Sequence, residues 1–143
     1  MSLDEILGYC GLYCGGCGTF QATAKGTGIE YDPRTSTTCR GCNSNDVSIW
    51  CRDCEIKTCA RERGLRYCLQ CESYPCEKAE RFRDDPRYPP HAATPALMAR
   101  LSEVGLEAWA AEQRQKWICE SCGREFGWFS QRCPGCGAAV NVR

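Results

Sequence analysis

Residues 51–76, CRDCEIKTCARERGLRYCLQCESYPC, contain two sets of cysteines with identical spacing. Cys51-x2-Cys54-x4-Cys59 recurs seventeen residues later as Cys68-x2-Cys71-x4-Cys76. A charged stretch typical of a helix follows each third cysteine, at residues 60–64 and 77–85. We therefore predict two copies of one unit: a Cys-x-x-Cys turn, a connector, and a cysteine near a helix N-terminus. A thiolate is favoured there because the helix end carries free N–H groups and positive partial charge.

Further cysteine motifs lie N-terminal to this repeat. Cys10-x3-Cys14-x2-Cys17 comes first, and Cys39-x2-Cys42 follows a polar stretch. A Cys-x-x-Cys pair lets two sulfurs of one tight turn reach a single metal ion. The total of 15 cysteines is odd, and the opening residues are too short and too acidic for a signal peptide. These features favour metal binding in a reducing compartment over disulfides, so we expect a cytoplasmic metalloprotein.

The cysteine-rich part holds few apolar side chains that could form a core. Only thirteen residues from Met1 to His91 are Leu, Ile, Val, Met or Phe. A structural zinc ion contributes roughly 10–16 kcal/mol to folding, which would replace much of the missing hydrophobic burial. We therefore expect three to four zinc ions, with iron–sulfur clusters as the less favoured alternative.

The grouping of the eleven N-terminal cysteines around these metals stays open. Spacing favours one site from Cys39, Cys42, Cys51 and Cys54 and a second from Cys59, Cys68, Cys71 and Cys76, which leaves Cys10, Cys14 and Cys17 without a known partner. The repeat instead predicts that the two triples are equivalent, each with a fourth ligand from elsewhere, such as Cys14/Cys17 or Cys39/Cys42. His91, a carboxylate or a water could also complete a third site, although a lone histidine among prolines is more typical of a solvated loop.

The C-terminal stretch WICESCGREFGWFSQRCPGCG, residues 117–137, has the spacing of a zinc ribbon. Its ligands would be Cys119, Cys122, Cys133 and Cys136, and glycine follows each pair. The aromatic residues between the pairs predict strands that cover the site. We expect a closed, tetrahedral, four-thiolate zinc site, which holds structure and leaves no position for a catalytic water.

These segments predict a small, metal-stabilised α+β protein. A cysteine-rich domain of zinc knuckles and short helices occupies residues 1–90, a helical connector residues 91–116, and a C-terminal β zinc ribbon residues 117–143. In the connector, apolar residues at helical spacing are interrupted by Gly105, which predicts one kinked helix or two short ones.

The composition excludes several classes of function. With a single histidine, the chain is a poor candidate for a Ser-His-Asp triad or a histidine-ligated catalytic zinc. It has no run of 18 apolar residues, so no membrane span is expected. Cys10, Cys14 and Cys17 have the spacing of a radical-SAM cluster motif, but the barrel of such enzymes does not fit in 143 residues. We favour a zinc-binding, non-enzymatic module that contacts protein or nucleic acid; the alternatives are an iron–sulfur electron-transfer protein and a zinc or thiol redox sensor.

The motifs YCGLYCGGC at residues 9–17, CRGC at 39–42, CRDCEIKTC at 51–59 and CLQCESYPC at 68–76 resemble an uncharacterised prokaryotic cysteine-rich family. Its members commonly show CGLxCxxC, CxGC, CxxCxIRxC and CxxCxxYPC, and Lys57 stands where the third motif often has arginine. Some relatives continue into a Gly-x-x-x-Trp helix, like Gly105–Trp109, and a ribbon. The resemblance implies a prokaryotic source and zinc binding, and it implies no reaction.

Overall fold

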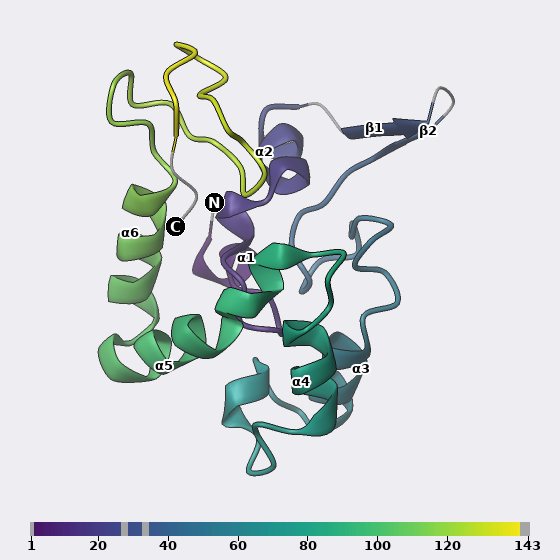
Figure 1. The fold of residues 1–143 in the computed structure, drawn as a ribbon. Helices are drawn as coiled ribbons and strands as arrows, with labels where there is room; N and C mark the ends of the chain where they lie inside the picture. Colours follow the sequence, from purple (N-terminus) through teal and green to yellow (C-terminus); the bar gives the residue numbers. More distant parts are fainter. Residues whose placement is uncertain (1, 27–28, 33–34, 141–143) are drawn as a thin grey trace.

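Short helices joined by loops make up most of the protein (Figure 1). The computed structural model describes residues 2–26, 29–32 and 35–140. Its elements, in chain order, are α1 (Leu3–Ile6), η1 (Cys14–Gly16), α2 (Gly18–Ala24), β1 (Ile29–Asp32), β2 (Thr35–Thr37), α3 (Glu55–Glu62), η2 (Cys68–Gln70), α4 (Glu77–Arg83), η3 (Pro89–Ala93), α5 (Thr94–Val104) and α6 (Leu106–Lys116). None of the helices in the described ranges is long and apolar enough to cross a membrane.

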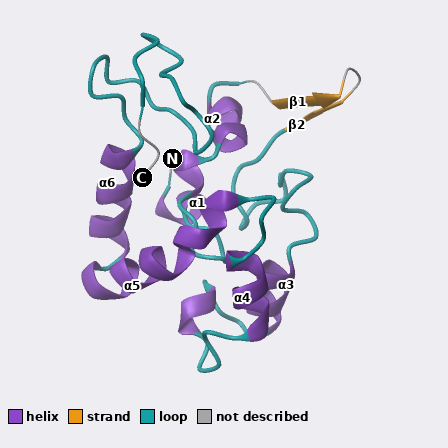
Figure 2. Cartoon of the chain, viewed as in Figure 1, coloured by secondary structure: helices purple, strands orange, loops and turns teal. Residues whose placement is uncertain are grey.

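The prediction of an α+β fold with a C-terminal β ribbon is wrong. Strands in the described chain are limited to β1 and β2, which pair antiparallel between α2 and α3 (Figure 2). Residues 117–140 contain only two isolated bridges, Ile118 with Glu125 and Arg132 with Ala139. The backbone there closes two tight turns. The rings of Trp117 and Phe126 belong to the hydrophobic core and Trp128 packs against it, whereas Phe129 is exposed.

The connector forms two short helices and not one kinked helix, the other predicted alternative. Helix α5 ends at Gly105, whose φ of 83° and ψ of 165° are accessible to glycine and strongly disfavoured for other residues. Helix α6 then leads to the loops of the C-terminal segment, residues 117–140 (Figure 1). Trp109 at its centre is 0% exposed and packs edge-on against Tyr13, with ring centroids 6.0 Å apart.

One hydrophobic cluster draws on both ends of the chain. It combines Ile6 and Leu7 beside α1, Phe20 in α2 and Trp109 in α6 with Phe126 of the C-terminal segment. The cysteines Cys119 and Cys133 belong to the same cluster and are buried. The C-terminal turns are therefore part of the protein's core.

The two copies of the cysteine repeat fold differently. In the second copy, Cys76 is the N-cap of α4, as predicted. In the first copy the helix begins earlier, so Cys54 is the N-cap of α3 and Cys59 lies inside that helix. The prediction for Cys59 is wrong because the EIKT stretch between the two cysteines is itself helical.

Candidate metal centres

The C-terminal cysteines form a compact group of four sulfurs. Their ligand atoms all lie within 4.8 Å of one another. Cys119 Sγ is 3.7 Å from Cys136 Sγ, and Cys122 Sγ is 3.5 Å from Cys133 Sγ. Tetrahedral zinc with bonds of about 2.3 Å places its sulfurs about 3.8 Å apart, so this spacing suits a single ion of that size. We call residues 117–140 the knuckle segment and this group the knuckle site.

The local sequence explains why these sulfurs converge. Gly123 and Gly137 each follow a Cys-x-x-Cys pair, and both have a φ of 76°, the left-handed region that glycine adopts at little cost. Their N–H groups donate to the carbonyls of Cys119 and Cys133, at 2.8 and 2.9 Å, which closes each turn. The N–H of Gly135 donates to Cys133 Sγ at 3.3 Å. Glycine at these two positions therefore allows each turn to close at little conformational cost.

Hydrogen bonds favour thiolate within the knuckle site. The backbone N–H groups of Cys136 and Gly135, together with the Cys122 thiol, lower the pKa of Cys133 to about 6. For Cys122 the Arg124 N–H acts in the lowering direction, but hydrogen bonding to Cys133 and the other thiols outweighs it and raises its pKa to about 11. Metal binding requires deprotonated sulfur, so Cys133 is the readier ligand of this pair and Cys122 must release a proton to bind.

The knuckle segment is fixed to α2 and η1 by buried hydrogen bonds. Gln21 donates through Nε2 to the carbonyls of Gly15, at 2.8 Å, and Phe126, at 2.9 Å. The Trp128 N–H donates to the Gly16 carbonyl at 2.9 Å. The bonds to Phe126 and from Trp128 join residues more than a hundred positions apart, and they hold the knuckle segment against α2 and η1.

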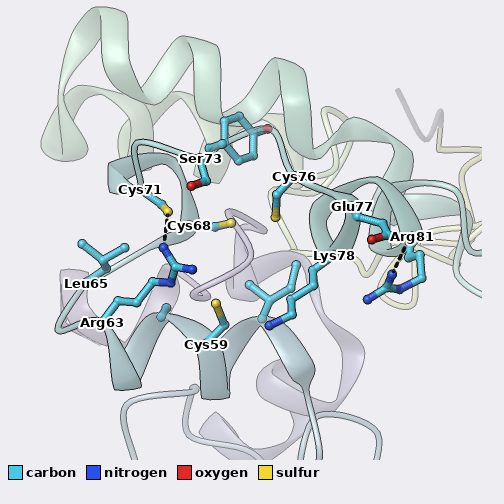
Figure 3. Close-up of a pocket in the computed structure, with 13 residues that line it drawn as sticks. Cys59, Arg63, Leu65, Cys68, Cys71, Ser73, Cys76, Glu77, Lys78 and Arg81 are labelled. Carbon is cyan, nitrogen blue, oxygen red and sulfur yellow. Dashed lines mark hydrogen bonds and ion pairs between the residues drawn. The ribbon is translucent and has the colours of Figure 1, made fainter.

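A second set of four cysteines lines a pocket of about 220 Å³ between α3 and α4. The set is Cys59, Cys68, Cys71 and Cys76, whose sulfurs surround a common space (Figure 3). This is one of the groupings that the spacing favoured. Arg63 donates through Nη1 to Cys71 Sγ at 3.4 Å.

Thiol pKa values differ across this pocket. Burial and the neighbouring thiols raise the pKa of Cys68 to about 11. A hydrogen bond from the Ser73 N–H, followed by the charge of Arg63, lowers the pKa of Cys71. Cys71 therefore ionises at lower pH than Cys68.

The remaining seven cysteines include Cys42, and five of the others lie near it. A hydrogen bond from the Cys14 thiol lowers the pKa of Cys42 to about 6. Cys10 is close enough to Cys42, Cys54 and Cys51 for their charges to raise its pKa, after burial as the larger cause. The structure thus places Cys10 and Cys14, which the spacing left without partners, beside the Cys39–Cys54 group.

The Cys39 turn repeats the backbone arrangement of the knuckle site. The N–H of Gly41 donates to Cys39 Sγ at 3.4 Å, as Gly135 does to Cys133. Gly41 has a φ of 95°, and its Cα faces the Glu5 carbonyl so closely that a Cβ would lie 2.5 Å from the oxygen. Only glycine fits at this turn, which keeps Cys39 and Cys42 against the start of the chain.

His91 does not behave as a solvated loop residue. Its ring stacks on Phe82 with centroids 3.7 Å apart, and on Tyr88 with centroids 5.0 Å apart. Nδ1 donates to the Phe82 carbonyl at 3.2 Å, and burial lowers its pKa. No group of metal-ligand atoms within 4.8 Å of one another includes His91 in the described part of the chain.

Two basic residues at these sites were not identified from the sequence. Lys57 is buried and donates through Nζ to the carbonyls of Cys51 and Arg52, both at 3.1 Å, which ties that turn to α3. Arg63 follows α3 and reaches Cys71. Helical periodicity could have indicated Arg63, because it lies four residues after Cys59 and so shares its helix face.

Comparison with known proteins gives a family without an assigned activity. A family model described as "Protein of unknown function (DUF3795)" matches residues 6–81. No curated protein and no solved structure matches the chain. The matched residues run from the last residue of α1 into α4 and include all eleven N-terminal cysteines, so the knuckle segment lies outside the match.

Proposed function

The chain belongs to the family described as a protein of unknown function (DUF3795), and from that premise we propose that it is a structural zinc protein that contacts another protein. The four knuckle sulfurs, all within 4.8 Å of one another, carry the proposal. Zinc with four thiolates is coordinatively closed, so neither water nor substrate can bind to it. The metal at this site would hold the fold and take no part in a reaction.

The contacts of the knuckle segment support a structural role. Zinc would fix the two turns relative to each other, and the bonds of Gln21 and Trp128 fix the turns to α2 and η1. Phe126 and Trp117 pack edge-on, with centroids 5.6 Å apart, beneath these bonds. Loss of the metal would release these side chains from the core as well as the turns.

Phe129 is the side chain that best fits a partner contact. It is 67% exposed on the loop between the two cysteine pairs, whereas Phe126, three residues earlier, is 4% exposed. The chain has 18 basic and 18 acidic residues, and four thiolates on one zinc add further negative charge. Nucleic acid requires a basic surface, so a protein partner suits this charge balance better.

Elemental analysis tests the metal. The wild-type protein should contain one more zinc ion per chain than Cys122→Ser, since loss of one thiolate opens the site. Ser121→Ala changes the neighbouring residue of the same turn and should keep the full zinc content. Equal zinc in the wild type and Cys122→Ser, or iron in place of zinc at this site, would contradict the proposal.

Crosslinking tests the partner surface. A photoreactive amino acid in place of Phe129 should form a discrete adduct with a polypeptide in cells, and the same group in place of Ala111, which is exposed on α6, should not. An adduct with nucleic acid, or identical adducts at the two positions, would argue against a protein contact at Phe129.

A further inference from the structure

The pocket cysteines are arranged differently from the knuckle cysteines. At the knuckle site the sulfurs approach each other to 3.5 and 3.7 Å, so that one ion fills the gap between them. In the described chain no other group of three or more potential ligand atoms lies within 4.8 Å of one another. The sulfurs of Cys59, Cys68, Cys71 and Cys76 instead surround a pocket of about 220 Å³. A single zinc ion cannot bind four sulfurs at this spacing without bringing them together.

We propose that this pocket binds a four-iron, four-sulfur cluster, with Cys59, Cys68, Cys71 and Cys76 as its thiolate ligands. Such a cluster takes one cysteine at each of four irons. Its ligand sulfurs stand farther apart than those of one zinc ion, because the cluster lies between them. The pocket supplies four thiols around one cavity, which is the donor set and the space that the cluster needs.

The elements around the pocket hold the four sulfurs in place. Cys59 projects from α3, Cys68 and Cys71 flank the single turn of η2, and Cys76 caps α4 (Figure 3). Arg81 of α4 pairs with Glu55 of α3 at 2.5 Å, at the edge of the pocket. The cavity is thus built from two helices and a turn that are tied together.

The charges around the pocket suit an anionic cluster. Arg63, Lys78 and Arg81 line it together with one acidic residue, Glu77. Arg81 is ion-paired with Glu55 and Glu77, so Arg63 and Lys78 are the cations that would offset the negative charge of a cluster with four thiolate ligands. Arg63 already donates an N–H to Cys71 Sγ at 3.4 Å. Hydrogen bonds to the ligand sulfurs stabilise the more reduced, more negative cluster and so raise its reduction potential. The side chains of Ile56, Ala60 and Leu65 form the apolar part of the lining.

The first test uses the wild-type chain, purified without oxygen. Iron and acid-labile sulfide should be present in equal amounts at four of each per chain, with a broad absorbance band at about 400 nm. X-ray absorption at the iron edge should show iron–iron scattering. Zinc without iron, a two-iron cluster, or mononuclear iron would overturn the proposal.

Variants then locate the cluster. Cys76→Ala should lose most of the iron and of the visible absorbance, while keeping the zinc of the knuckle site. Cys122→Ser is the matched control, because it should lose that zinc and keep the iron. This pair also separates the cluster from the proposed zinc function, since either can fail without the other. Full retention of iron in Cys76→Ala would overturn the assignment to this pocket.

A gentler variant covers the case in which Cys76→Ala does not fold. Arg63→Gln keeps all four thiols and removes one N–H donor and one positive charge. It should retain the iron and lower the reduction potential of the cluster, whereas Lys116→Gln, on α6 and outside the pocket lining, should leave it unchanged. Equal potentials in Arg63→Gln and the wild type would place the cluster elsewhere.

Discussion

At the scale of single residues, Gly16 shows how closely the knuckle segment packs on the N-terminal part. A Cβ at this position would overlap the indole ring of Trp128. Gly16→Ala should therefore destabilise the protein by about 1–3 kcal/mol, because overpacking displaces the ring. Gly18 is the matched control two residues later, where a Cβ meets nothing within 4 Å. Chemical denaturation of the two variants measures the difference; equal stabilities would mean that Trp128 does not lie over Gly16.

His91 should make the stability of the protein depend on pH. Burial lowers its pKa from the ordinary value of 6.5, against the opposing effects of the Phe82 carbonyl and Asp85. The unfolded chain then binds more protons than the folded protein, so the stability from neutral His91 is present above pH 6.5 and is lost as pH falls through the lower folded pKa.

The variant His91→Phe keeps a ring on Phe82 and cannot titrate. The unfolding free energy of the wild type, minus that of the variant, should become smaller as the pH is lowered from about 7.5 to about 5.5. Taking the difference cancels the acid sensitivity of the thiolate sites, which both proteins share. A constant difference across this range would show that His91 titrates alike in the folded and unfolded chain.

The sequence allowed us to recognise those residues whose hydrogen-bond partners lie close to them along the chain. The knuckle cysteines and Gly123 and Gly137 were predicted because a Cys-x-x-Cys-Gly turn contains its own hydrogen bonds. Gln21 could not be predicted to bond Phe126, since that contact spans 105 positions. Arg63 was missed because its role depends on the pocket that brings Cys71 near the end of α3.

At the scale of elements, Gly105 determines the turn between α5 and α6. Its φ of 83° with ψ of 165° lies outside the left-handed helical region that asparagine tolerates. Gly105→Ala and Gly105→Asn should therefore both destabilise the protein, by about 1–3 kcal/mol. Ser102→Ala, at an exposed position of α5, should change stability by less than about 0.5 kcal/mol. Thermal unfolding measures these effects, and rescue by asparagine would contradict the assigned conformation.

Helices were easier to predict than the conformation of the knuckle segment. Charged runs after Cys59 and Cys76 indicated helices, and α3 and α4 are found there, although α3 starts earlier, at Glu55. The aromatic spacing between Trp117 and Phe129 also fits strands, and the expectation of a β ribbon followed from it. Aromatic residues at this spacing fit a strand, and they also fit a loop that packs its rings against the core. The sequence pattern alone therefore could not distinguish a strand from a loop.

At the scale of the whole molecule, the shared core links the stability of both ends of the chain. Phe126 is 4% exposed and belongs to the cluster that contains Ile6 and Leu7. Phe126→Ala should cost about 3–5 kcal/mol and should lower the protection of the N-terminal helices as well as the knuckle segment. Phe129→Ala is the control, because Phe129 is 67% exposed and its loss should cost little.

Hydrogen exchange, read separately for residues 2–26 and 117–140, measures this coupling. It also tests the predicted division of the chain at residues 90 and 116. Loss of protection confined to the knuckle segment would show that this segment is a separate folding unit.

The chain-wide grouping of cysteines could be predicted only in part. The spacing favoured one metal site formed by Cys59, Cys68, Cys71 and Cys76, and these four cysteines line one pocket. The placement of Cys10 and Cys14 beside Cys42 depends on the loop between β2 and α3, whose path no local pattern specifies. Long-range contacts of this kind follow from packing of the complete chain.

The contact between Trp128 and Gly16 also has a consequence for synthesis of the protein. Ribosomes release the chain from its N-terminus, so η1 and α2 emerge more than a hundred residues before the indole that covers them. Until residues 117–140 have emerged and closed their turns, the side of α2 that bonds Phe126 is left in water. Burial of this side of α2 therefore waits for synthesis of residues 117–140, and the proposed zinc site would make it sensitive to a shortage of metal during translation.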